Sequence, residues 1–137
     1  MVNLIIKPAI LLLFLCSLTT GTVANEGAIP EMLAKYRSQG AGDFSATGVK
    51  ALWNKKVRTK DGKERSCSTC HQSNLKSQGT HFKTGKVIEP MALSVNPERY
   101  QKAKKIKKWF LRNCKWTWGR ECTAQEKGDF LTYLKAQ

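Results

Sequence analysis

The sequence predicts a small all-α domain, and three observations carry this prediction. Apolar side chains recur at spacings of three and four residues, helix-start signals precede the later of these stretches, and one long aperiodic stretch separates the early helices from the late ones. The 137 residues contain no internal repeat and no low-complexity linker. A single domain with one compact core is therefore expected.

The composition of the first 24 residues sets them apart from this domain. Lys7, the apolar residues 9–15 and the small-residue site Thr22-Val23-Ala24 are typical of a cleaved signal peptide. The apolar run is shorter than the roughly 20 residues that span a bilayer, so an uncleaved anchor is the less favoured alternative. Residues 1–24 are therefore predicted to be a signal peptide, and residues 25–137 the mature domain of a periplasmic protein.

Two helices are expected before the central loop. The first covers residues 29–38, because Pro30 suits a helix start and one face is apolar. That face consists of Met32, Leu33 and Tyr36. The second covers about residues 45–55, with Val49, Leu52 and Trp53 on one face, and a turn follows at Lys60-Asp61-Gly62-Lys63.

Residues 73–95 have Gly79, Gly85 and Pro90 but no hydrophobic period, which predicts a long loop ordered by something that it wraps. Asn96 and Pro97 then provide the cap and first position of a helix that continues to about residue 113. Its expected inward face consists of Ile106, Trp109, Phe110 and Asn113.

The last helix is expected to begin after Thr123, which has the spacing of a capping box with Glu126. An apolar stripe along this helix is formed by Phe130, Leu131 and Leu134. Only helices are expected in the mature domain.

The motif Cys67-Ser68-Thr69-Cys70-His71 follows the turn directly. Its two thiols can form thioethers with the two vinyl groups of a haem, and the histidine immediately after them can bind the iron. A thioredoxin-like dithiol would follow a strand, and none is expected before Cys67. A zinc site would need a second Cys/His pair at zinc spacing. The motif and the order of elements together predict a small cytochrome c wrapped around one covalently attached haem c.

The remaining cysteines fit this interpretation. Cys16 leaves with the signal peptide, and each other cysteine needs a partner in an oxidising compartment. If the haem thioethers take Cys67 and Cys70, then Cys114 and Cys122 are left to form one disulfide.

The residues alone leave the second iron ligand open. Met91 follows Pro90 in the central loop, where a distal methionine would lie, but a methionine there is more often a packing residue. Asn113 ends an apolar helix face and could bind iron, although the pattern favours a helix cap. His81 is expected at the surface or beside a haem propionate.

Several segments resemble the sphaeroides haem protein type of cytochrome c. They are Arg112-Asn113-Cys114, Gly119-Arg120-Glu121-Cys122-Thr123, Glu126-Lys127-Gly128-Asp129, Ile88-Glu89-Pro90-Met91 and Asn96-Pro97-Glu98-Arg99, with Thr84-Gly85-Lys86, Phe44-Ser45-Ala46 and Leu52-Trp53. The resemblance covers nearly the whole mature chain. It implies a class I-like monohaem domain with Asn113 as distal ligand and a Cys114–Cys122 disulfide. The aromatic segment Lys115-Trp116-Thr117-Trp118 departs from the family pattern.

A neutral amide is a weak iron ligand, and reduction of the iron should loosen it. The resemblance therefore implies an electron-accepting protein that binds oxygen or nitric oxide once reduced. An ordinary electron carrier with His71/Met91 ligation and a gas sensor or scavenger are the alternatives. Apart from the haem, no acid–base constellation indicates catalysis, so reduction of oxygen or nitric oxide by the protein stays open.

The formal net charge of +14 falls to +13 when Lys7 is removed, and such a protein seeks anionic surfaces. An exported protein rarely meets nucleic acid, and no motif for binding it is present. The expected partner is an acidic di- or multihaem cytochrome c or a membrane cytochrome b, with peripheral membrane contact at most. The cations between Arg99 and Arg120, on and just after the third predicted helix, are the expected docking face. They are Lys102, Lys104, Lys105, Lys107, Lys108, Arg112 and Lys115.

Overall fold

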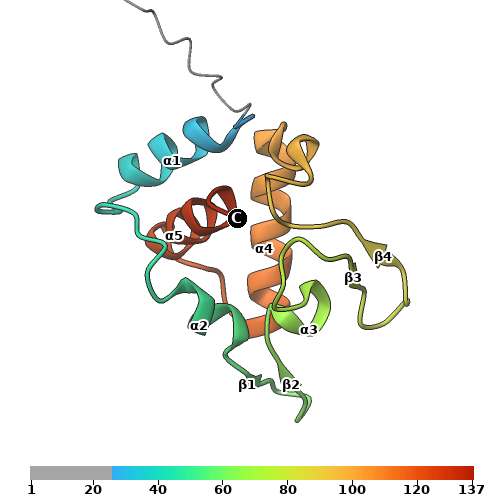
Figure 1. The fold of residues 1–137 in the computed structure, drawn as a ribbon. Helices are drawn as coiled ribbons and strands as arrows, with labels where there is room; N and C mark the ends of the chain where they lie inside the picture. Colours follow the sequence, from blue (N-terminus) through green and yellow to red (C-terminus); the bar gives the residue numbers. More distant parts are fainter. Residues whose placement is uncertain (1–25) are drawn as a thin grey trace, which may run out of the picture.

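The computed structural model describes residues 26–137, which form a helical domain with two small β-ribbons (Figure 1). The elements are α1 (Ile29–Ser38), α2 (Val49–Asn54), β1 (Val57–Arg58), β2 (Glu64–Arg65), α3 (Ser68–His71), β3 (Gly79–Thr80), β4 (Val87–Ile88), the 3₁₀ helix η1 (Pro97–Tyr100), α4 (Ala103–Trp118) and α5 (Ala124–Lys135). The predicted signal peptide lies outside the described residues. Among residues 26–137, no helix is long and apolar enough to cross a membrane.

The core lies where α1 packs against α5, with α4 beside them (Figure 1). Ile29 and Met32 of α1 and Leu131 of α5 are completely buried there. Phe44, from the segment between α1 and α2, lies against the backbone of α5. A Cβ added at Gly128 would stand 2.0 Å from the ring of Phe44, so this contact requires glycine.

Two of the predicted helices are confirmed. The first helix has the predicted bounds, with Met32 and Tyr36 buried. The last begins at the predicted capping box, in which Glu126 N donates to Thr123 Oγ1 at 3.1 Å and Thr123 N donates to Glu126 Oε2 at 2.8 Å. Local signals determine both elements.

The prediction that the second helix starts near residue 45 is wrong, because α2 begins at Val49. Ser45 N donates to Asp129 Oδ1 at 2.9 Å, and Thr47 N donates to Ser45 Oγ at 3.0 Å. These side-chain acceptors replace helical bonds. Gly48, with φ of +81°, then turns the chain into α2.

The predicted all-α class is confirmed by the five α-helices of residues 26–137, but the expectation of helices only is wrong in detail. β1 and β2 pair antiparallel around the predicted turn, and β3 and β4 form a second ribbon within the long loop. The premise that no strand precedes Cys67 fails as well, since β2 ends at Arg65. Each ribbon has only two residues per strand, unlike the buried parallel strand of a thioredoxin-like βαβ unit.

The helix predicted for residues 96–113 is divided and longer. Asn96 and Pro97 start only η1, and the Asn96 side chain donates to Pro90 O at 3.1 Å rather than capping. The backbone is extended at Lys102, and α4 then continues to Trp118, ending at Gly119 with φ of +69°. No breaker lies between residues 113 and 119, so the helix runs past its predicted end.

The predicted inward face of this helix is confirmed only in part. Ile106 is buried, and Phe110 and Asn113 are half-buried. Trp109, however, is 51% exposed. The cations of Lys108 and Arg112 lie 5.8 Å and 5.4 Å from the centroid of its ring, which lets the indole remain at the surface.

Candidate functional site

Helix α3 presents the two thiols and the histidine of the motif from one helical turn. Cys67 occupies the position before the helix, while Cys70 and His71 end it. Ser66 N donates to Thr69 Oγ1 at 2.9 Å, which fixes the start of the turn. Cys67 is half-buried and Cys70 is buried, and neither takes part in a disulfide. The motif therefore has the compact geometry that two thioether bonds to the two vinyl groups of one haem require.

The ribbon β3–β4 packs directly on this turn. A Cβ at Gly79 would stand 2.0 Å from Cys70 O and 3.0 Å from His71 Cα. Only a glycine permits this approach. The long loop is thus anchored to the motif at the residue where it forms β3.

His71 has the properties of an iron ligand. Its Nδ1 is buried and has no hydrogen-bond partner among the described residues. Burial, with a smaller contribution from the charge of Arg99, lowers the pKa of His71 to about 4. The imidazole is therefore neutral at neutral pH, the form that binds metals. A buried ring nitrogen without a partner is costly unless something binds it.

The thiols do not fit the rival chemistries. Burial raises the pKa of the Cys67 thiol to about 12, with a smaller contribution from Cys70. Reactive dithiols need lowered pKa values. Within residues 26–137, no cluster of three or more His, Cys, Asp or Glu side chains could hold a metal ion. The donor set thus fits haem attachment better than a dithiol or a zinc site.

Aromatic side chains form an apolar wall next to His71. The Trp53 ring lies 5.7 Å from the His71 ring, and Trp53 Nε1 donates to Gln72 O at 2.8 Å. Phe130 packs 6.0 Å from Trp53 and 5.8 Å from Trp118, measured between ring centroids. Trp118 Nε1 is buried without a hydrogen-bond partner within the described part of the chain. Such a wall suits a large, flat, mostly apolar group with polar edges.

Asn113 lies inside α4, five residues before its last residue, Trp118. The alternative that Asn113 caps the helix is therefore wrong, since Gly119 ends the helix instead. Asn113 is half-buried, and no hydrogen bond to its amide is found among the described residues. The amide is thus available as a ligand.

Cys114 and Cys122 form a disulfide with Cα atoms 5.6 Å apart. Both residues are buried, and the bond joins the last turns of α4 to the segment before α5. It therefore holds the residue directly after Asn113.

The other candidate ligands have structural roles here. Met91 N donates to Leu75 O at 2.9 Å, and Met91 O accepts from Tyr100 Oη at 2.6 Å, so its backbone is fixed in the loop. The Met91 side chain packs against the core. His81 is exposed, and its Nδ1 accepts from Thr84 N at 3.2 Å in the turn between β3 and β4.

Two residues that sequence reasoning missed connect the motif with the helix of Asn113. Arg65 Nη1 donates to Trp116 O at 3.4 Å, and its guanidinium carbon lies 4.6 Å from the centroid of the Trp116 ring. The pair is 51 residues apart in the chain. No local pattern predicts such a contact; the aromatic segment at residues 115–118 was its only signal.

The chain matches a family model described as a domain of unknown function, DUF1924, over residues 39–134. It is 33% identical over 118 residues to the cytochrome c-type protein SHP of Cereibacter sphaeroides, covering 84% of this chain and 88% of that protein. It is also 37% identical over 90 residues to cytochrome c'' of Methylophilus methylotrophus. That match covers 66% of this chain and only 62% of the relative's length.

Solved structures of both relatives are similar to this fold. Oxidised SHP, described as an oxygen-binding cytochrome c, aligns with a TM-score of 0.72 at 33% identity, covering 81% of this chain and 98% of that one. Oxidised cytochrome c'' aligns with a TM-score of 0.69 at 31% identity, covering 80% and 94%. A solution structure of cytochrome c'', which addresses haem-ligand detachment, aligns at 0.71 and 30% identity, covering 80% and 93%.

Proposed function

Since the chain belongs to the DUF1924 family, together with SHP and cytochrome c'', it is a monohaem c-type cytochrome, and we propose that after reduction it binds a small diatomic molecule in place of Asn113. One haem c is covalently bound, and the fold is the small helical cytochrome c fold of these relatives. In this proposal Cys67 and Cys70 attach the haem and His71 is the permanent ligand.

The observation that carries the proposal is the unpaired, half-buried amide of Asn113 within α4. An amide is a neutral and weak iron ligand, so its binding depends on how the protein positions it rather than on its intrinsic affinity for iron. The haem would supply a one-electron couple and an iron atom that oxygen or nitric oxide can bind. Asn113 would hold that iron in the oxidised protein and would release it more easily in the reduced one.

What is known of the relatives supports this assignment. SHP is described as oxygen-binding, and cytochrome c'' has been studied for detachment of a haem ligand. The site residues Cys67, Cys70, His71 and Asn113 fall within residues 39–134, the part of the chain that the family model matches. These facts favour an exchangeable ligand over His71/Met91 ligation.

The test uses the reduced protein and carbon monoxide as the probe. We expect a high-spin ferrous spectrum that carbon monoxide converts to a low-spin one. Asn113→Ala should make the ferric protein high-spin, whereas Met91→Leu should leave the spectrum unchanged. A six-coordinate ferrous protein that ignores carbon monoxide would refute the proposal, and sensitivity of the spectrum to Met91→Leu would assign His71/Met91 ligation.

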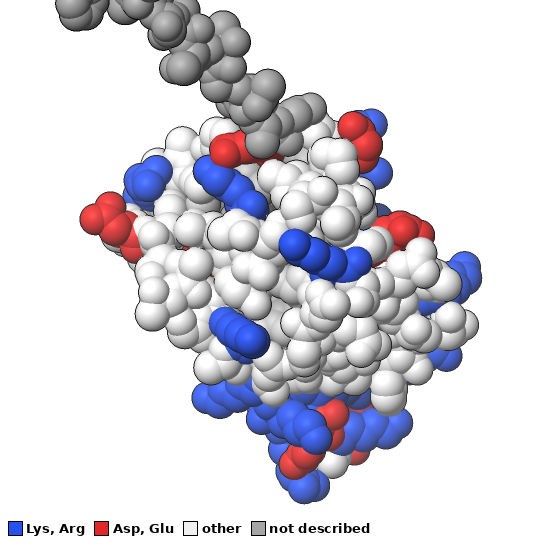
Figure 2. Space-filling model, in the orientation of Figure 1, with Lys and Arg blue, Asp and Glu red and all other residues white. Residues whose placement is uncertain are grey.

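We further propose that the protein is periplasmic and receives its electron from an acidic di- or multihaem cytochrome. The cations along the outer side of α4 are exposed and have few acidic neighbours; they are Lys102, Lys104, Lys105, Lys107, Lys108 and Arg112. Lys and Arg side chains also gather at the end of the domain that carries β1 and β2 (Figure 2). Exposed charges are screened by salt, so the rate of reduction by such a donor should fall steeply as ionic strength rises. A salt-independent rate would count against it.

A further inference from the structure

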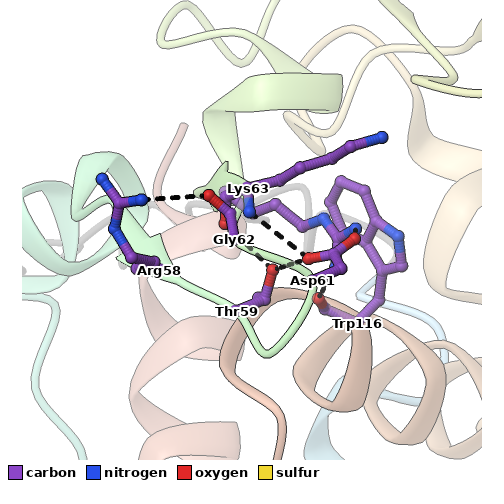
Figure 3. A network of polar contacts seen from close by, with 7 residues as sticks. Arg58, Thr59, Asp61, Gly62, Lys63 and Trp116 are labelled. Atoms are coloured by element: carbon purple, nitrogen blue, oxygen red, sulfur yellow. Dashed lines mark hydrogen bonds and ion pairs between the residues drawn. The ribbon is translucent and has the colours of Figure 1, made fainter.

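Arg65, in the strand that leads into the haem motif, contacts Trp116 of α4. Figure 3 shows Trp116 beside the turn that carries Asp61 and Lys63. Arg65 lies two residues before Cys67, and its side chain is only 13% exposed. The guanidinium stacks on the indole at 4.6 Å, donates to Trp116 O at 3.4 Å and forms an ion pair with Asp61. Asp61 also accepts from Thr59 Oγ1, which holds the carboxylate in the turn.

Trp116 is held from a second side by the ribbon β3–β4. The ring of Phe82, in the turn of this ribbon, lies 5.7 Å from the Trp116 ring. Lys63 Nζ from the other ribbon lies 5.7 Å from the centroid of the Phe82 ring. Trp116 is therefore packed between both ribbons, which flank the haem motif.

Trp116 follows Asn113 by three residues in the same helix, so the two are neighbours along one side of α4. The two positions are less than one helical turn apart, so the same turn of backbone hydrogen bonds couples them. Fixing Trp116 against Arg65 therefore limits how far Asn113 can move relative to α3. The disulfide at Cys114 ties the same helix to the segment before α5 instead.

We propose that Arg65 and Trp116 are positioning residues that hold Asn113 over the iron and thereby set how easily an external ligand displaces it. This inference rests on the proposed function, because it requires Asn113 to be the exchangeable ligand. Lysine would not replace Arg65, since stacking on the indole and bonding to a carbonyl together need the planar guanidinium. The ion pair with Asp61 would keep that plane oriented.

The test compares Arg65→Gln and Trp116→Leu with Arg58→Gln as the matched control. Arg58 lies in the same ribbon and forms an ion pair with Glu64, but its side chain is 72% exposed. The readouts are the ferric spin-state spectrum, the affinity for imidazole in the ferric protein and the thermal midpoint. We expect Arg65→Gln and Trp116→Leu to increase the high-spin fraction and the imidazole affinity by about three- to tenfold, the effect of losing a partly desolvated cation–π contact.

The conservative variants Trp116→Phe and Arg65→Lys extend the test if the first pair folds poorly. Trp116→Phe keeps an aromatic face and should retain most of the wild-type affinity, while Arg65→Lys should behave as Arg65→Gln does. A lower thermal midpoint with an unchanged spectrum and imidazole affinity would overturn the proposal, because the contact would then be only structural. So would an equal effect of Arg58→Gln.

Combining these changes with Asn113→Ala separates the two proposals. If Asn113 is the ligand and Arg65 acts through it, Arg65→Gln should not change imidazole affinity further in the Asn113→Ala protein. A further change there would overturn the positioning role and leave Asn113 ligation intact. A normal ferric spectrum in Asn113→Ala itself would instead refute the proposed function.

Discussion

Removal of the disulfide by Cys114→Ala/Cys122→Ala tests how much the closed segment contributes to the domain. The two residues are separated by 8 positions, so the bond closes a loop of nine residues. On the chain-entropy model, such a loop stabilises the folded state by roughly 2.5 kcal/mol. Both sulfurs are also buried, with residues 7% and 4% exposed, so their loss removes packing as well.

A loss of this size should lower the thermal midpoint by about 10 °C for a domain of this length. Thermal unfolding followed by far-UV circular dichroism measures it. Chemical reduction of the wild-type bond is the matched control, because it opens the loop while keeping both sulfur atoms. A decrease below about 2 °C, with opening of the bond verified by mass, would refute the loop-closure reasoning.

Two further predictions concern the motif turn and the last helix. Gly79→Ala would place a methyl group against Cys70 O. We therefore expect a lower yield of haem-loaded protein, measured by haem absorbance, and a lower thermal midpoint, measured by melting. Normal haem loading would contradict the close packing. The hydrogen bond from Arg120 lowers the pKa of Glu126 in the folded state. The ionised Glu126 therefore stabilises the fold above the unfolded pKa of 4.5, and this stabilisation is lost as the pH falls through the lowered folded pKa. Glu126→Gln should therefore lower the melting temperature more at pH 7 than at pH 3, whereas an equal decrease at both would show that charge plays no part.

Local signals determined what could be predicted from the sequence. The motif residues Cys67, Cys70 and His71 share one turn, and the capping box at Thr123 is formed within four residues. The start of α2 depends instead on Asp129, 84 positions away, so the helical period at residue 45 was misleading. Tertiary contacts override propensity in such places.

Sequence patterns predicted only those parts of the site whose residues are close together in the chain. Residue patterns allowed two roles for Asn113, a helix cap or an iron ligand, because the choice depends on where α4 ends. The structure extends that helix to Trp118 and removes the cap, whereas the ligand assignment came from the family resemblance. The exposure of Trp109 was missed because the spacing of apolar residues carries no information on nearby cations, which here shield the indole from solvent.

Under the proposed ligation, the arrangement around Asn113 explains how a weak ligand can be displaced and still return to the same position. A strong donor would keep the position closed, and a weak donor on a mobile loop would rarely return to it. Here the amide is carried by a helix that is fixed just beyond it, by the disulfide at Cys114 and by Arg65 at Trp116. Because the helix is already ordered, rebinding of the amide costs little conformational entropy. Under the same proposal, the affinity of Asn113 for the iron can be low while its occupancy in the oxidised protein is high, and the balance between Asn113 and an external ligand would depend on residues that touch neither.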